Sequence, residues 1–314
     1  MHDLANVFLS YYVKEFNRIR RENINLAHYT NILSGYSILK KKEIWLRNIT
    51  NMSDNMEVKW GLELFKIFLY DNNNLLYNRL TEALAQAHKD VKYWKLVIDE
   101  MVDNFYEKYA KNTYILSLTE FSNKNIDFNL FKSFCKDEGL IFIFNDNYNN
   151  EVVKTLNLSR VAYFNGLEFK KYFIKFIESI ETNKNSIESC NLKDVEELFK
   201  QAIFYAILSI KHPSFKEENE WRIVYCSEFG NYSNLSNLIT NDNVEIKGNL
   251  EKIYKINLDL LNTNNLLCNI VSIYEENEIE QLLNREINKW QTFNNKNFVE
   301  FKIEKQFKLK TKKI

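Results

Sequence analysis

The scarcity of glycine and proline is the sequence feature that most constrains the fold. The 314 residues contain six glycines and one proline, whereas average usage would be about 7% and 5%. Loops that cradle phosphates need several glycines at fixed spacing, as in G-x-x-x-x-G-K-S and G-x-G-x-x-G, and neither pattern occurs. The sequence therefore lacks the fingerprint of the nucleotide-binding folds that depend on these loops.

Short apolar runs bounded by turn-forming residues mix irregularly with amphipathic segments. The runs predict strands at residues 26–30, 44–49, 114–118, 140–144, 160–164, 223–226, 253–258, 269–274 and 299–309. The amphipathic spacing predicts helices at residues 32–41, 128–136, 169–181, 192–210 and 279–290, with two or three more between 58 and 109. Polar loops are expected at residues 52–57, 145–150 and 228–243. Because regular βαβ alternation is missing, we expect an α+β fold with a mixed or antiparallel sheet flanked by helices.

The whole chain, residues 1–314, is interpreted as one domain. Its 45% hydrophobic content is ample for a sizeable core. An amphipathic helix over residues 1–22 precedes a core over residues 24–310. The helices at residues 58–110 are expected to form an insertion or a flanking helical layer.

Charge and cysteine usage indicate a protein of the reducing cytoplasm. The formal net charge is zero, so no global field recruits nucleic acid or an acidic membrane. The four cysteines are widely spaced and the four histidines are scattered, which favours neither a disulfide framework nor a zinc site. No signal peptide is recognisable, and the longest apolar stretch, residues 202–210, is too short for a bilayer. We therefore expect a cytoplasmic location, no membrane contact and no metal.

The segment Glu218 to Arg222, Glu-Asn-Glu-Trp-Arg, is the strongest candidate for a site. In an extended strand Glu218, Glu220 and Arg222 point to one face. Two neighbouring carboxylates repel, so one of them should have a raised pKa unless Arg222 compensates. Arg222 is one of only eight arginines among 42 basic residues. A solvated, ion-paired strand face is the ordinary alternative for such a segment taken alone.

Three further segments carry polar side chains at the ends of predicted elements. His28, with Tyr29 and Thr30, ends an extended segment, although a single histidine there is more often a satisfied core residue. Ser117 and Thr119 place two hydroxyls on one face of a strand, where they could hold a ligand or simply bind the backbone. The loop acids Asp54 and Glu57 could bind a metal or a ribose, or be solvated.

The order of these segments resembles a family of bacterial domains of unknown function that look like distant relatives of the ADP-ribosyltransferase fold. The resemblance covers residues 26–275, in order. Its matching segments lie at residues 28–30, 38–39, 44–46, 52–57, 117–122, 139–144, 161–163, 211–212 and 218–222. The chain departs from the family at residues 53–55, where Ser-Asp-Asn replaces the more frequent Asn-Asp-Pro, and at residues 131–134.

The resemblance implies a split sheet with NAD as the substrate bound in its cleft. Glu220 would stabilise the oxocarbenium-like ribose that forms when the nicotinamide bond breaks. Glu218 would polarise the acceptor, and His28 would hold the adenosine-side ribose. Ser117 and Thr119 would support the carboxylate.

The remaining candidate residues would bind the cofactor. Arg222 would pair with Glu218 or with a phosphate, and Trp45 or Tyr29 would stack on a ring. Thr30, Asp54 and Glu57 complete the NAD-binding set. The resemblance further implies a toxin-like effector in conflict between bacteria and phage. It leaves open a regulatory partner protein and the acceptor, which could be protein, nucleic acid, a small molecule or water.

Two other functions remain open at this point. A noncatalytic module could keep the fold and use the cleft to sense a nucleotide or a partner. A metal-dependent nuclease could use Asp54, Glu57, Glu218 and Glu220 around a divalent ion, although no nuclease signature occurs.

Overall fold

A computed structural model describes residues 2–52, 56–70, 73–121, 128–135, 138–144, 157–229, 239–258, 266–272 and 285. Within these residues, nine strands form one antiparallel sheet. They are β1 (Asn25–Asn31), β2 (Glu43–Asn48), β3 (Thr113–Phe121), β4 (Glu138–Phe144), β5 (Asn157–Arg160), β8 (Glu220–Cys226), β9 (Ile239–Ile246), β10 (Asn249–Asn257) and β11 (Leu266–Ser272). The short strands β6 (Ala162–Tyr163) and β7 (Ile210–Lys211) pair in parallel.

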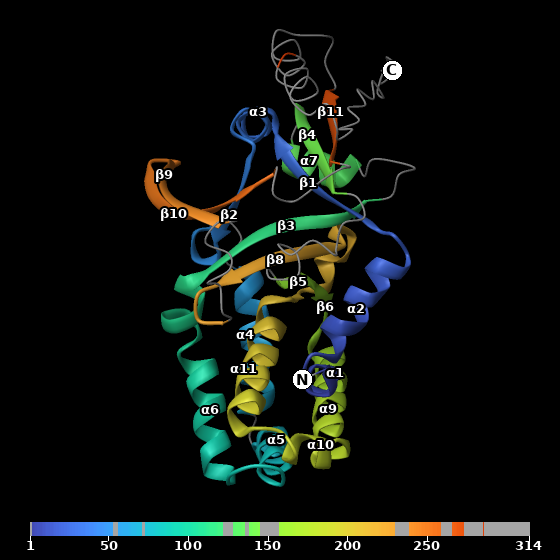
Figure 1. Cartoon of the computed structure of the whole chain (residues 1–314), viewed down its shortest axis with the longest axis vertical. Helices are drawn as coiled ribbons and strands as arrows, with labels where there is room; N and C mark the ends of the chain where they lie inside the picture. Colours follow the sequence, from blue (N-terminus) through green and yellow to red (C-terminus); the bar gives the residue numbers. More distant parts are fainter. Residues whose placement is uncertain are drawn as a thin grey trace, which may run out of the picture.

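The large sheet forks along one edge of β3. Near its end β3 pairs with β1, which continues to β4 and β11. Near its start β3 pairs with β2, which continues to β10 and β9. Strand β8 covers the other edge of β3 and pairs with β5. Figure 1 shows the two branches rising from β3 in different directions. The sheet is therefore split where the two branches part.

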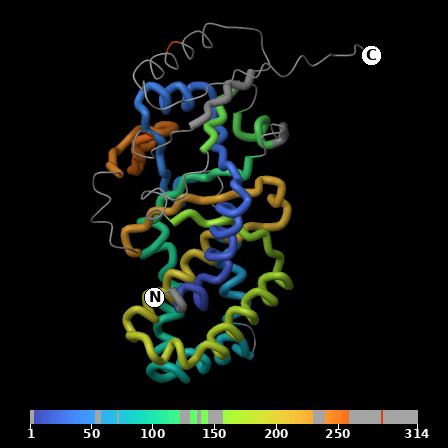
Figure 2. The backbone as a smooth tube through the Cα atoms, turned by 45° about the vertical axis from the view of Figure 1, so that its right-hand side comes forward, coloured from blue at the N-terminus to red at the C-terminus, as the bar shows by residue number. Residues whose placement is uncertain are grey.

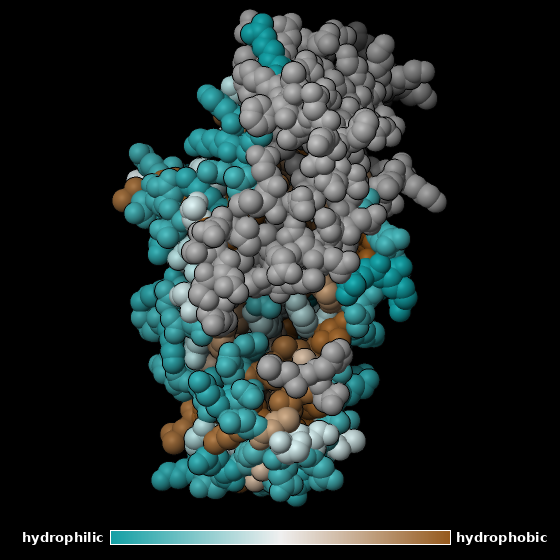
Figure 3. Space-filling view, viewed as in Figure 1, coloured by the Kyte–Doolittle hydropathy of each residue, from teal (hydrophilic) through white to brown (hydrophobic). Residues whose placement is uncertain are grey.

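A helical layer packs under β3 and β8 and forms the lower half of the elongated molecule (Figures 1 and 2). Ile115, Val224 and Cys226 of the sheet join the core of this layer. Hydrophobic residues are visible on the surface of this half among hydrophilic ones (Figure 3). The helices of the layer are α1 (His2–Phe8), α4 (Met56–Leu69), α5 (Leu75–Ala85), α6 (Val91–Asp103), α9 (Gly166–Thr182), α10 (Lys184–Glu188) and α11 (Leu192–Leu208).

Three other helices lie against the sheet. α3 (Ile32–Lys41) connects β1 to β2 and begins at Asn31, whose side chain accepts a hydrogen bond from the Ser34 amide, as expected for a helix cap. α7 (Phe128–Cys135) packs on β1 and β4. α2 (Ser10–Arg21) packs on β5. Short helical turns lie at η1 (Ile49–Asn51), η2 (Phe105–Tyr109), η3 (Ala110–Asn112) and η4 (Pro213–Glu218).

The predicted N-terminal helix over residues 1–22 is wrong as a single element, because the chain breaks at Leu9 into α1 and α2. Leu4, Val7 and Phe8 of α1 are buried in the helical layer, whereas Ile19 of α2 is buried against the sheet. The break lets each helix bury its apolar side in a different core.

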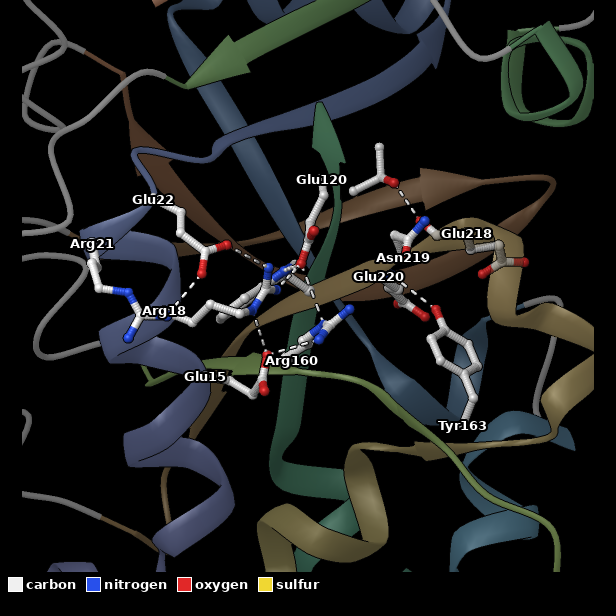
Figure 4. Close-up of polar contacts among 12 residues, drawn as sticks. Glu15, Arg18, Arg21, Glu22, Glu120, Arg160, Tyr163, Glu218, Asn219 and Glu220 are labelled. Carbon is white, nitrogen blue, oxygen red and sulfur yellow. Dashed lines mark hydrogen bonds and ion pairs between the residues drawn. The ribbon is translucent and has the colours of Figure 1, made fainter. Parts of the chain in front are cut away.

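An ion-pair network fastens α2 to the sheet (Figure 4). Arg18 pairs with Glu15 at 2.8 Å and with Glu120 of β3. Arg160 of β5 pairs with the same two carboxylates, at 2.8 and 3.3 Å. The Trp221 indole donates to Glu120 at 3.0 Å. Because Glu120 and Trp221 alternate with Thr119 and Glu220, this network occupies the face of β3 and β8 opposite those residues.

Some of the predicted element boundaries are wrong. The loop expected at residues 228–243 ends earlier, because residues 239–246 form β9 and pair with β10 across a turn at Lys247 and Gly248, both of positive φ. The strand expected at residues 160–164 is divided between β5 and β6. The predicted helix at residues 279–290, apart from residue 285, and the predicted strand at residues 299–309 lie outside the described residues. The expected α+β class, with an antiparallel sheet flanked by helices, is confirmed.

Candidate active site

A cavity of about 270 Å³ opens at the fork of the sheet. It is bounded by β1, β2, β3 and the turn before β8, and His28, Trp45, Ser117 and Glu220 are among its lining residues. Strand β2 pairs with β3 at Ile115 and Tyr114, and β1 pairs with β3 from Thr119 onward. Between these points the edge of β3 faces the cavity.

Glu220 and Arg222 form the centre of this site. They lie two residues apart on β8 and therefore point to the same face. Arg222 donates from Nε to Oε1 of Glu220 at 2.8 Å and from Nη2 to Oε2 at 3.0 Å. Ser117, directly opposite Arg222 on β3, donates to Oε1 of Glu220 at 2.7 Å. Ser117 and Arg222 thus hold the Glu220 carboxylate by three hydrogen bonds while it still borders the cavity.

Arg222 binds Glu220, and not Glu218 as one alternative from the sequence proposed. Its third nitrogen, Nη1, donates to the carbonyl oxygen of Leu208 at the end of α11. Only 1% of Arg222 is exposed. The guanidinium therefore connects Glu220 on β8 to the end of α11 in the helical layer.

Lys211 is a further member of the site that the sequence did not single out as a functional residue. The helix expected to run to residue 210 ends at Leu208, and Lys211 lies on β7. Its Nζ donates to Oε2 of Glu218 at 2.6 Å and to Oε2 of Glu220 at 3.3 Å. Only 2% of Lys211 is exposed. The available signal was that Lys211 belongs to one of the segments that carry the family resemblance.

Glu218 lines the cavity from a helical turn, whereas the sequence pattern predicted that it lies in a strand. It ends the helical turn η4, and Asn219 follows in the left-handed conformation with φ of 42°, so Glu218 is not part of the strand. Thr119 donates to the carbonyl oxygen of Glu218. The Tyr163 hydroxyl accepts a hydrogen bond from the backbone amide of Glu220 at 2.8 Å, and Figure 4 shows this hydroxyl pointing at the turn. Thr119 and Tyr163 therefore hold the turn from two sides. The Lys211 ammonium bridges the carboxylates of Glu218 and Glu220.

The environments of the two carboxylates drive their pKa values apart. Burial raises the pKa of Glu220, but the charges of Arg222 and Lys211 and the hydrogen bonds from Arg222 and Ser117 outweigh it and leave a pKa of about 2. For Glu218, burial together with the charge of Glu220 outweighs Lys211 and raises the pKa. Divergent pKa values in one pair are typical of acid and base roles in active sites. Glu220 is therefore ionised, and Glu218 is the carboxylate better suited to exchanging a proton.

His28 lies on β1, on the other side of β3 from this pair. Its Nδ1 is 3.1 Å from the carbonyl oxygen of Ser117, and because a carbonyl only accepts, Nδ1 carries the hydrogen. Burial lowers the pKa of His28 and outweighs this hydrogen bond. In the neutral ring Nε2 is then an acceptor, available for a ligand hydroxyl.

The other sequence-predicted residues are distributed around two neighbouring cavities. Tyr29 and Trp45 line the first. Thr30 lines a second cavity of about 450 Å³ between α3, β1 and β2, which also borders His28, Trp45 and Arg47. Arg47 lines both cavities and was not predicted from the sequence.

The polar loop predicted at residues 52–57 lies partly outside the described residues. Asp54 lies outside the described residues. Glu57 is placed in α4 rather than in a loop, and only its backbone is described. Within the described residues, no group of three or more histidine, cysteine, aspartate or glutamate side chains is arranged to hold a metal ion. Across the same residues, none of the helices combines the length and apolar character needed to cross a bilayer.

Comparison with known proteins relates part of the chain to a family model. No curated protein and no solved structure matches the chain. One segment of the chain, residues 107–223, matches a family model. It contains Ser117, Thr119, Lys211 and the Glu218–Arg222 segment, whereas His28, Trp45 and Arg47 precede it. Over residues 107–223 the chain matches the model of a family described as "Protein of unknown function (DUF2971)".

Proposed function

We propose that this chain breaks the nicotinamide–ribose bond of NAD in the cavity at the fork, as an ADP-ribosyltransferase or an NAD glycohydrolase. The observation that carries the proposal is the position of Glu220, an ionised carboxylate that is fixed by Ser117 and Arg222 and borders a cavity lined by His28 and Trp45. The split of the sheet also supports a fold similar to that of ADP-ribosyltransferases.

Glu220 acts on the ribose in this proposal. As the bond breaks, positive charge develops on the ribose carbon, and a fixed carboxylate stabilises that charge without having to reorganise. The hydrogen bonds from Ser117 and Arg222 hold Glu220 in one orientation. The aromatic side chains Trp45 and Tyr29 border the same cavity and are suited to packing against the nicotinamide ring.

Glu218 acts on the acceptor. Its raised pKa brings it closer to neutral pH than Glu220, which favours a general base. Its side chain is 22% exposed, so an acceptor can approach it from solvent. The bond between the ribose carbon and the nicotinamide nitrogen breaks, and the electron pair leaves with the now neutral nicotinamide. The acceptor hydroxyl adds to the ribose carbon and gives its proton to Glu218.

The biological setting is part of the same proposal. Cys135, Cys190 and Cys226 are free thiols, which suits the reducing cytoplasm. There, consumption of NAD or modification of an essential acceptor would make the chain a toxin-like effector, with antiphage defence as a setting and a partner protein as a means of control. Its expression should then be toxic, and Glu220→Gln should relieve the toxicity.

Release of nicotinamide from NAD by the purified chain tests this function. Wild-type protein should release it, whereas Glu220→Gln should lose activity by about a hundredfold or more, the scale expected when a transition-state contact is removed. Glu217→Gln is the matched control, because Glu217 is exposed one residue before Glu218. Equal rates in Glu220→Gln and wild type would show that Glu220 is not the catalytic residue.

A noncatalytic nucleotide sensor is the second candidate, and a specific observation favours it. Lys211 and Arg222 both contact Glu220 and offset its negative charge, which weakens its stabilisation of a developing cation. A sensor would bind NAD, as measured by calorimetry, with unchanged ligand recovered afterwards. The nuclease alternative is less favoured, because the Lys211 ammonium occupies the position between Glu218 and Glu220 where a divalent cation would bind.

A further inference from the structure

Arg47 lies where β2 leaves β3. It is opposite Ile115, and the next residue along β2, Asn48, is opposite Tyr114. Toward Trp45 the two strands separate and the fork opens. Arg47 borders both the 270 Å³ cavity beside Glu220 and the 450 Å³ cavity beside α3. A ligand that occupies both cavities therefore passes Arg47.

Among the described residues, the hydrogen bonds that hold the Arg47 guanidinium come from one nitrogen, Nη2. Nη2 donates to both carboxylate oxygens of Glu251 on β10, at 3.1 and 2.9 Å, and to the carbonyl oxygen of Asn51 at 3.4 Å. Within the part of the chain that the structure describes, Nε is buried without a hydrogen-bond partner. Buried polar atoms without a partner are rare in folded proteins and call for an explanation.

The other cations of the first cavity are already engaged by protein groups. Arg222 uses its three nitrogens on Glu220 and on the carbonyl oxygen of Leu208. The Lys211 ammonium is shared between Glu218 and Glu220. Arg47 is different, because its acidic partner Glu251 does not line either cavity and approaches it from the β10 side. The phosphate role that the sequence left open for Arg222 thus suits Arg47 better.

We propose that Arg47 binds the phosphate groups of a ligand whose two halves occupy the two cavities. Arginine binds phosphate oxygens through several parallel N–H groups, and its geometry here is set by Glu251. The chemical class is a two-part ligand joined by a diphosphate. The identification of that ligand as a dinucleotide rests on the proposed function.

Calorimetric titration of the full chain with adenosine, ADP and inorganic pyrophosphate tests the inference. Wild-type protein should bind ADP about tenfold more tightly than adenosine, since a hydrogen bond to a charged group contributes on this scale. Arg47→Gln should lose about tenfold in affinity for ADP and pyrophosphate and keep its affinity for adenosine. Arg79→Gln is the matched control. This variant breaks the ion pair between Arg79 and Glu181, and Arg79 borders neither cavity.

Unchanged binding of ADP in Arg47→Gln, or equal binding of ADP and adenosine by the wild type, would overturn the inference. Thermal unfolding shows whether Arg47→Gln folds. If it does not, Arg47→Lys keeps the charge but not the planar guanidinium, and it should weaken ADP binding by about threefold or more. ADP affinity equal to wild type in Arg47→Lys would then overturn the inference.

The titration separates this inference from the proposed function, because it needs no turnover. A chain that binds ADP through Arg47 but never releases nicotinamide contradicts the proposed function alone. A chain that releases nicotinamide with the same KM for NAD in Arg47→Gln and wild type contradicts the role of Arg47 alone.

Discussion

Arg222 holds Glu220 from the same face of the same strand, with Nε 2.8 Å from Oε1 and Nη2 3.0 Å from Oε2. The pair is buried, with Glu220 only 5% exposed. Two-residue spacing along β8 places both side chains on the face toward the helical layer, and Ser117 of β3 adds a third contact to the carboxylate. The carboxylate that we propose to be catalytic is therefore also a structural element of the sheet.

Arg222→Gln should destabilise the fold strongly. It leaves Glu220 buried without its closest cation, and breaking a buried ion pair in this way costs about 3 kcal/mol or more. Urea unfolding at pH 7 measures the loss. Arg79→Gln breaks an arginine–glutamate pair whose side chains are 37% and 35% exposed, so it should cost less than about 1 kcal/mol. Similar losses in the two variants would contradict the burial argument.

The folded state should lose stability in acid through Glu220. Its pKa is about 2 in the folded protein, below the ordinary 4.5. Between these values the unfolded chain binds a proton that the folded chain does not, so the free energy of unfolding falls as pH falls from 4.5 toward 2.

This effect is isolated by comparing Glu220→Gln with wild type. Urea unfolding from pH 5 to pH 2 measures the free energy of unfolding of each protein. The variant should show a shallower decline with falling pH than wild type, while Glu217→Gln should follow the wild-type curve. A Glu220→Gln curve parallel to wild type would mean that Glu220 is not held ionised in the fold.

Lys211→Met should raise the pKa of Glu218 further. Burial is the largest influence on Glu218 and raises its pKa, while the hydrogen bond and charge of Lys211 lower it. Without the ammonium, only the weaker charge of Arg222 remains to oppose burial. Carbon-13 NMR of the side-chain carboxyls, assigned through Glu218→Gln, follows the titration. The exposed Lys216 on the same turn provides the control, Lys216→Met. A pKa that stays constant or falls in Lys211→Met would contradict the contact.

Local sequence rules were sufficient for much of the scaffold and part of the site. The helix over residues 32–41 was predicted with its observed boundaries, because its apolar spacing is a local property. Likewise, strand alternation placed Ser117 and Thr119 on one face of β3 and Glu220 and Arg222 on one face of β8, and the pairing of the two strands makes these the same face of the sheet.

What the sequence could not supply depends on contacts between distant segments. Lys211 looked like the end of a helix, and its role arises because β7 carries it to Glu218 and Glu220. Glu218 fits a strand pattern, but the left-handed Asn219 ends the pattern. Residues 239–246 are rich in turn-forming asparagine and aspartate, and they become a strand only because β10 pairs with them.

Gly61→Ala should destabilise the junction that carries Lys211. A methyl group on Gly61 of α4 would lie 2.2 Å from the carbonyl oxygen of Ile207 in α11, and neither backbone can move without shifting its helix. Overpacking of this kind costs about 1 to 3 kcal/mol. At Gly166, the first residue of α9, the same methyl would meet only Phe68 at 3.7 Å. Thermal unfolding should therefore show a clear loss for Gly61→Ala and little change for Gly166→Ala, and equal effects would contradict the close packing of α4 on α11.

A crystal structure of Glu220→Gln soaked with NAD tests the proposed site directly, because this variant should bind the substrate without consuming it. We expect nicotinamide and its ribose in the cavity at the fork, with a ribose hydroxyl within hydrogen-bond distance of the residue 220 side chain and the diphosphate beside Arg47. NAD bound at another surface, or a cavity left empty at saturating NAD while the turn before β8 keeps its conformation, would contradict the proposed function.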